Sequence, residues 1–169
     1  GFVLSIISFV LLLLASKTGS YSTLFASGVY GLSLCILYFC SAKYHHTQDP
    51  VKKLFYRKLD HISIYVLIAG TYTPYTLIFL SHSKGVLLFG IVWSIALLGA
   101  FLKTFFTGRF EIISLLLYLV MGWLIVYDFT ALALAVSPRA ISLLIAGGGF
   151  YTAGILFYVR NSLKYNHVL

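Results

Sequence analysis

The stretch Ser41–His61, SAKYHHTQDPVKKLFYRKLDH, is the longest polar interruption in an otherwise apolar chain. It holds three of the five histidines and two of the four acidic residues. Apolar runs of helix length stand on both sides of it. A chain with so few ionisable residues has few places for chemistry, so this stretch is the first candidate for a functional site.

The composition indicates an integral membrane protein. Hydrophobic residues make up 60% of the 169 residues and charged residues only 9%, whereas a soluble domain has about 25% charged residues. The net charge of +8 arises from cations in short connections between apolar runs, where they determine membrane topology. We therefore expect membrane lipids as partners and no nucleic acid. Cys35 and Cys40 lie in one apolar run and are predicted to be small buried side chains.

Six apolar runs predict an all-α fold, a polytopic bundle of transmembrane helices, because a spanning helix needs ~20 mostly apolar residues. The predicted helices are Gly1–Ala15, Tyr21–Cys40 continuing through His45, Ile62–Leu80, Gly85–Leu102, Ile112 to about Val126 or further if Asp128 lies at its end, and Ile141–Val159. Pro74 is expected to kink the third helix. The chain begins at Gly1 without a methionine and stops just after His167. We expect a single domain over residues 1–169, clipped at both ends, with six spans and the start of a seventh.

Two features of the connections and helices add local detail. Asp49 followed by Pro50 predicts a helix N-cap and first helical residue. Val51–Arg57 would then be a short interfacial helix, or else an ordered basic loop, and the sequence leaves both open. Gly147-Gly148-Gly149, with Gly154, predicts that a neighbouring helix approaches the sixth helix closely.

The distribution of Lys and Arg predicts the orientation. Nine of these residues fall on the side of the second-to-third and fourth-to-fifth connections and of the segment after the sixth helix: Lys43, Lys52, Lys53, Arg57, Lys58, Lys103, Arg109, Arg160 and Lys164. The other side has Lys17, Lys84 and Arg139. Because cytoplasmic loops are enriched in Lys and Arg, the first side and the N-terminus are predicted to be cytoplasmic.

Ser41, His45, Asp60 and His167 are predicted to meet near the cytoplasmic boundary. Ser41 and His45 are four residues apart and share one helical face. Asp60 is expected to open the third helix, and His167 returns to the same membrane face after an even number of crossings. Intramembrane ionisable groups mark function by default, and imidazole and carboxylate suit zinc. The alternative is that boundary histidines simply lie among lipid headgroups.

Several motifs in chain order resemble the bacterial hemolysin III family. They are Ser41-x-x-x-His45, Lys58-Leu59-Asp60-His61 leading into Ala69-Gly70-Thr71-Tyr72-Thr73-Pro74, Tyr118-Leu-Val-Met-Gly122-Trp123, Gly147-Gly148-Gly149-Phe150-Tyr151-Thr152-Ala153-Gly154, and Tyr165-Asn166-His167. The resemblance covers nearly the whole chain. This family belongs with the progestin and adiponectin receptors and the alkaline ceramidases, seven-helix proteins that resemble metal-dependent hydrolases. It implies the inner membrane of a bacterium.

The resemblance also implies a zinc site. One ligand would be a histidine of the second helix, matched by His45, and two would be histidines of a seventh helix, of which His167 matches the first. The third would fall two residues past Leu169, outside this chain. Asp60 and Ser41 match the catalytic pair beside the zinc. His46 or His61 is an alternative ligand.

The implied activity is hydrolysis of a lipid amide. Two readings from other classes stay open: a pore-forming cytolysin, which the family name suggests, and a non-catalytic receptor or regulator with structural zinc. A pore should show a polar stripe along its helices, which the first, fourth and sixth runs almost lack. Lys52, Lys53, Arg57 and Lys58 would either attract anionic headgroups or serve only as a topology signal.

Overall fold

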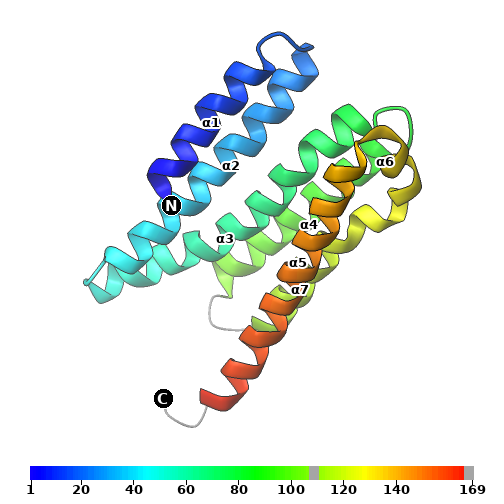
Figure 1. The fold of residues 1–169 in the computed structure, drawn as a ribbon. Coiled ribbons are helices and arrows are strands. Elements are labelled where there is room, and N and C mark those ends of the chain that lie inside the picture. The colour runs from blue at the N-terminus through cyan, green and yellow to red at the C-terminus, as the bar shows by residue number, and fades with distance from the viewer. Residues whose placement is uncertain (107–110, 166–169) are drawn as a thin grey trace.

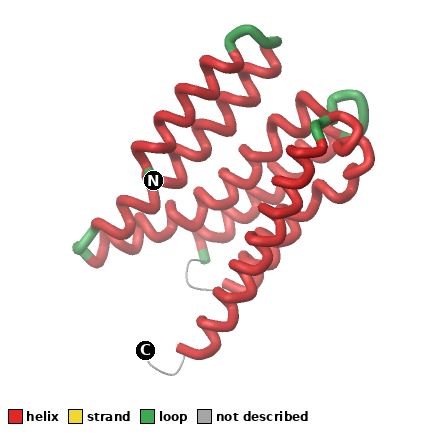
Figure 2. The backbone as a smooth tube through the Cα atoms, viewed as in Figure 1, coloured by secondary structure: helices red, strands yellow, loops and turns green. Residues whose placement is uncertain are grey.

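The computed structural model describes the backbone of residues 1–106 and 111–165, and side chains as far as residue 157. The described part of the chain is helical and has no strand, as predicted (Figures 1 and 2). The elements are α1 (Phe2–Ser16), α2 (Tyr21–His46), α3 (Pro50–Pro74), the π-helix η1 (Tyr75–Phe79), α4 (Gly85–Phe105), α5 (Glu111–Trp123), the 3-10 helix η2 (Leu124–Asp128), α6 (Phe129–Ala135) and α7 (Pro138–Tyr165).

Five helical segments within the described residues are long and apolar enough to cross a membrane. They are Tyr21–His46, Pro50–Phe79, Gly85–Phe105, Glu111–Ala135 and Pro138–Phe157. The apolar α1 is shorter, at 15 residues. The α2–α3 connection and the C-terminal ends of α4 and α7 lie at one end of the bundle, and the connections after α1, η1 and α6 lie at the other (Figure 1). The predicted polytopic bundle, and with it an integral membrane protein, is confirmed.

The third span differs from its prediction at both ends. Asp49 is the N-cap, as expected, and its Oδ1 accepts hydrogen bonds from the backbone N–H groups of Val51 at 2.9 Å and Lys52 at 3.1 Å. From Pro50 the helix continues unbroken to Pro74, so neither a separate short helix nor a basic loop forms. Asp60 consequently lies inside α3 and does not open it. The capped start and the absence of a breaker let the helix extend beyond its apolar run.

The irregularity predicted at Pro74 is a change of helix type. The α-helical pattern ends there and the π-helix η1 follows. Proline has no backbone N–H to continue the ladder. Neighbouring hydroxyls bond carbonyls in this region, since Oγ1 of Thr73 donates to the Ala69 carbonyl and Oγ1 of Thr76 to the Tyr72 carbonyl, both at 2.9 Å. Side-chain hydroxyls are a common way to satisfy backbone groups at such irregularities.

The fifth span is broken in its middle and extends to Ala135, further than the predicted end at Val126. At the break the Tyr72 hydroxyl of α3 donates to the Gly122 carbonyl at 3.1 Å and accepts from the Ile125 N–H at 2.8 Å. One buried phenol thus satisfies two backbone groups where the α-helical ladder ends. Asp128 lies at the junction of η2 and α6, inside the span, and its Oδ2 accepts from the Lys84 N–H at 3.0 Å.

The core is built around α3. Tyr65 is completely buried, lies against Gly99 of α4, and stacks on Tyr118 of α5 with ring centroids 4.3 Å apart. A side chain at position 99 would collide with the Tyr65 ring. Close packing of small residues is how helices associate where lipid is as apolar as the side chains. Glycine therefore gives Tyr65 its place.

The sixth predicted helix, α7, is longer than expected. It begins at Pro138 and includes positions 160–165, which were expected to form a connection. The prediction that Gly147–Gly149 and Gly154 admit a neighbouring helix is wrong for the described residues, because a Cβ at any of them would meet nothing within 4 Å. The close contact uses a glycine of the partner helix instead, since Gly122 of α5 lies against Tyr151.

Candidate functional site

The structure places three of the four predicted site residues. Ser41 is half-buried in α2, and His45 is exposed in the last turn of α2, with its ring centroid 4.9 Å from that of Tyr44. Asp60 is half-buried in α3, and its charge acts on Cys40, the neighbour of Ser41 in sequence. The turn of α2 that contains Ser41 and the turn of α3 that contains Asp60 are therefore close. His167 lies outside the described residues, and its convergence with His45 stays a prediction.

The described residues supply only part of the zinc site that was predicted. Within them no group of three His, Cys, Asp or Glu side chains lies close enough together to hold a metal ion. His45 and Asp60 offer donor types that zinc accepts, an accessible imidazole and a carboxylate. The predicted second ligand is at position 167 and the third is beyond the chain. The donor chemistry fits zinc, and the site stays a prediction.

A cavity of about 460 Å³ adjoins Asp60. Its walls come from three helices: Asp60 and His61 from α3, Glu111 and Tyr118 from α5, and Tyr151 from α7. The rest of the lining is mainly apolar. The ionisable groups of α3 and α5 therefore meet at one cavity, close to the end of the bundle that has the α2–α3 connection (Figure 1).

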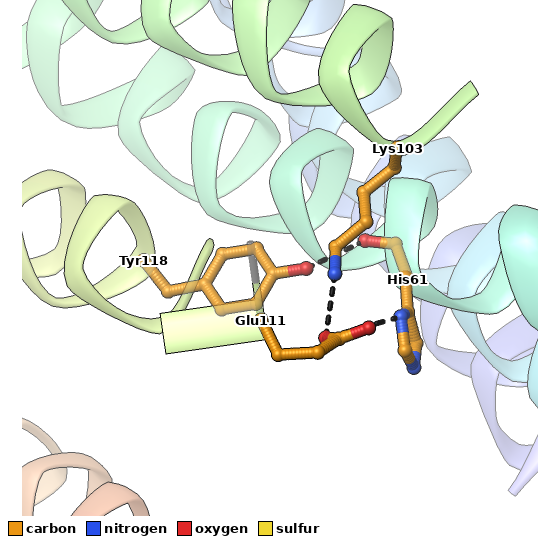
Figure 3. Close-up of polar contacts among 4 residues, drawn as sticks. All are labelled: His61, Lys103, Glu111 and Tyr118. Carbon is orange, nitrogen blue, oxygen red and sulfur yellow. Dashed lines mark hydrogen bonds and ion pairs between the residues drawn. The ribbon is translucent and has the colours of Figure 1, made fainter. Parts of the chain in front are cut away.

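An ionic cluster stands at the edge of this cavity (Figure 3). Lys103 of α4 is 1% exposed, and its Nζ lies 2.6 Å from Oε2 of Glu111 at the start of α5. The same oxygen lies 4.0 Å from Nδ1 of His61. The Tyr118 hydroxyl donates to the His61 carbonyl at 2.9 Å. Figure 3 shows Glu111 between Lys103 and His61, so one carboxylate joins groups from α3 and α4 to α5.

Sequence reasoning missed most of this cluster. Lys103 counted only toward topology, Glu111 was not considered, and His61 appeared only as an alternative zinc ligand. A signal was available, because Glu111 is one of four acids in the chain and starts an apolar run eight residues after Lys103. An ionisable residue at the edge of a membrane span is a site candidate by default.

A second, more apolar cavity of about 610 Å³ adjoins the first. It lies between α3, the broken α5–η2 region and α7, and shares Ile64 and Tyr151 with the first cavity. Gly147 and Gly148 of α7 line it. The glycines that were expected to contact a helix therefore leave space in the bundle. A polar end with carboxylates and an apolar extension together suit an amphiphile.

Comparison with known proteins identifies the family. The family model described as "Haemolysin-III related" matches residues 1–164. The chain belongs to the hemolysin III family. Among curated members of this family, Hemolysin-3 of Bacillus cereus is 40% identical over 170 residues, which cover 100% of this chain and 78% of that protein. The Hemolysin-3 homolog of Bacillus subtilis (strain 168) is 38% identical over the same length, with 80% of it covered. No solved structure matches.

Membership of the hemolysin III family confirms the resemblance found in the motifs. The match and the apolar helices agree on an integral membrane protein. The names of the two relatives refer to hemolysis. The metal ligands and the catalytic pair of this hemolysin III protein stay predictions.

Proposed function

We propose that this hemolysin III protein is a zinc-dependent hydrolase of a lipid amide, with its site at the end of the bundle that has the α2–α3 connection. The observation that supports this most is the position of Asp60. Its carboxylate lines a cavity that adjoins a longer apolar cavity. A hydrolase of a lipid needs this pairing, a proton-transfer group at the end of a space for an alkyl chain.

In this proposal His45 and His167 hold the zinc, with a third histidine beyond the described chain. Zinc, when bound, contributes Lewis acidity that activates water and polarises a carbonyl. The carboxylate of Asp60 takes a proton from the attacking water and returns it to the departing amine. The hydroxyl of Ser41 orients the water or donates a hydrogen bond to the developing oxyanion. The alkyl chain lies along Ile64 and Tyr151 into the second cavity.

The metal part of the proposal is tested on the full-length protein. Elemental analysis of purified protein should give close to one zinc per chain, and His45→Ala should lose most of it. The matched control is His82→Ala, because His82 is exposed at the opposite end of the bundle. A protein without zinc, or a His45→Ala variant with unchanged zinc content, would refute the proposed ligand set.

The enzymatic part is tested with a panel of fatty-acid amide lipids in mixed micelles, with release of free fatty acid as the readout. Asp60→Asn should lower the rate by about 100-fold or more, because general acid–base catalysis contributes 10²–10⁴-fold. The same variant should retain its zinc. Zinc binding without turnover of any amide would favour a receptor or regulator with structural zinc.

A second candidate function, lysis of membranes, is suggested by the names of the relatives. The outward side chains of the described helices are largely apolar, as in α1 and α4. That pattern suits contact with lipid better than the lining of a pore. Leakage of dye from liposomes at nanomolar concentrations of the protein, unaffected by Asp60→Asn, would favour lysis over hydrolysis.

A further inference from the structure

The tip of the α2–α3 hairpin, defined here as residues 43–58, has a high density of positive charge. It contains Lys43, Lys52, Lys53, Arg57 and Lys58 against a single acid, Asp49. The Asp49 carboxylate already accepts two backbone hydrogen bonds as the N-cap of α3. The hairpin tip therefore presents a cationic surface.

Exposed apolar side chains lie within the same segment. Val51 is 78% exposed, Leu54 58% and Phe55 57%. They are spaced at i, i+3 and i+4, so they share one face of α3. Lys52 and Arg57 flank this face. A helix segment with an apolar face and flanking cations is typical of the interface between water and lipid.

The length of the third span places this segment relative to a bilayer. Pro50–Phe79 has 30 residues, about 45 Å of helix at 1.5 Å per residue. The hydrocarbon core of a bilayer is about 30 Å thick. The apolar part of the span begins at Ile62, so the polar part before it extends into the headgroup layer. Figure 1 shows the tip projecting from the rest of the bundle.

Aromatic rings and a carbonyl lie next to several of the cations. Nζ of Lys53 lies 6.0 Å from the ring centroid of Tyr44, and Nζ of Lys43 lies 5.7 Å from that of Phe39. Nζ of Lys58 donates to the Thr104 carbonyl at 3.3 Å. An ammonium group has three donors, so these contacts leave capacity for phosphate oxygens. The lysines at positions 43, 52 and 53 are exposed.

We propose that the hairpin tip binds anionic phospholipid headgroups of the leaflet that it enters. The lysines at positions 43, 52 and 53 contact phosphate oxygens, and Val51, Leu54 and Phe55 insert below them toward the acyl chains. Lipid is the partner because the two spans that form the hairpin carry the tip into the headgroup layer. The proposal does not depend on the hydrolase activity and concerns a surface separate from the cavity.

The test measures which lipids stay bound to the full-length protein. Protein extracted from vesicles of equal parts phosphatidylglycerol and phosphatidylcholine is analysed by native mass spectrometry. The parent should retain mainly phosphatidylglycerol. Lys52→Glu/Lys53→Glu should lose this preference, since each lysine near an anionic surface contributes about fivefold in affinity. Lys17→Glu/Arg139→Glu makes the same charge change at exposed positions of the other end and should retain the preference.

Further arms separate the lipid from other causes. The preference should weaken between 50 and 500 mM salt, because screening shortens electrostatic interactions. Leu54→Ser/Phe55→Ser should lower total lipid retention at both salt concentrations, and inorganic phosphate should not displace the lipid. Thermal unfolding of each variant confirms that it is folded. Equal retention of the two lipids by the parent overturns the proposal, as does a Lys52→Glu/Lys53→Glu variant that changes oligomeric state and leaves lipid retention unaltered.

Discussion

At the scale of single residues, the pair Lys103 and Glu111 shows how this chain accommodates charge inside a membrane protein. A buried ion pair contributes little net stability, because desolvation of both charges offsets their attraction. Loss of one partner is a different matter, since it leaves the other charge uncompensated. The pair also joins α4 to α5 beside His61 of α3, so it helps to fix the edge of the cavity.

We expect Lys103→Met to destabilise the protein by about 2 kcal/mol, below the 3–5 kcal/mol typical of a fully buried pair, because the Glu111 side chain is 36% exposed. Unfolding in mixed micelles with increasing SDS measures the change. The double variant Lys103→Met/Glu111→Leu should recover most of the loss, since it removes both charges. Equal instability of the single and double variants would mean that the packing of Lys103 matters more than its charge.

The Tyr72 hydroxyl is the second residue-scale feature. In Tyr72→Phe the Ile125 N–H and the Gly122 carbonyl lose their shared partner at the helix break. The expected loss is about 1–3 kcal/mol, the penalty for buried backbone groups without a hydrogen bond. Tyr21→Phe is the control, because Tyr21 is exposed in the first turn of α2. Similar unfolding curves for the two variants would show that water or another group replaces the phenol.

At the scale of the elements, helix existence could be predicted from apolar runs, but helix ends could not. The predicted start of α4 at Gly85 is confirmed, and so is the continuation of α2 past His45. The third helix begins at Pro50 because a cap and a proline, and not the loss of apolarity at His61, define its start. Hydropathy detects the bilayer, whereas caps and breakers determine where a helix ends.

The same distinction explains what was found of the candidate site. Ser41 and His45 could be placed on one helix because their spacing is local. The contact of Lys103 with Glu111 and His61 depends on how α3, α4 and α5 pack, which a single sequence does not specify. The role of Gly147–Gly149 was wrong for the same reason, because glycine indicates space without indicating what fills it.

Two glycines of α4 offer a matched test of this packing. Gly99→Ala places a methyl group against the Tyr65 ring and should destabilise the protein by about 1–3 kcal/mol, as overpacking does. Gly90→Ala meets nothing within 4 Å in the described structure, and should be neutral or stabilising by up to about 1 kcal/mol through helix propensity. Unfolding of both variants in mixed micelles decides the matter. Tolerance of alanine at position 99 would contradict the close contact of α3 and α4.

At the scale of the whole molecule, the structure places the charged connections at two opposite ends of one bundle (Figure 1). The end with the hairpin tip has the greater number of Lys and Arg residues in the sequence. The positive-inside rule then predicts that this end faces the cytoplasm. The prediction concerns orientation only, and is independent of whether the cavity is catalytic.

Labelling of single cysteines in bacterial cells tests the orientation. In a background with Cys35→Ala and Cys40→Ala, Ser81→Cys should react with a membrane-impermeant maleimide added to intact cells. Leu54→Cys should react only after the membrane is made permeable. Both positions are exposed and lie at opposite ends of the described bundle. The reverse pattern would place the hairpin tip and the N-terminus outside.

The ion pair between α4 and α5 has a consequence for biogenesis. A lysine released alone into hydrocarbon costs up to about 2.5–3.5 kcal/mol on the scale measured for translocon-mediated insertion. Lys103 and Glu111 belong to consecutive spans and are only eight residues apart in sequence. They can therefore neutralise each other while the nascent chain is still sheltered by the insertion machinery, so that α4 and α5 enter the lipid together as a preassembled pair.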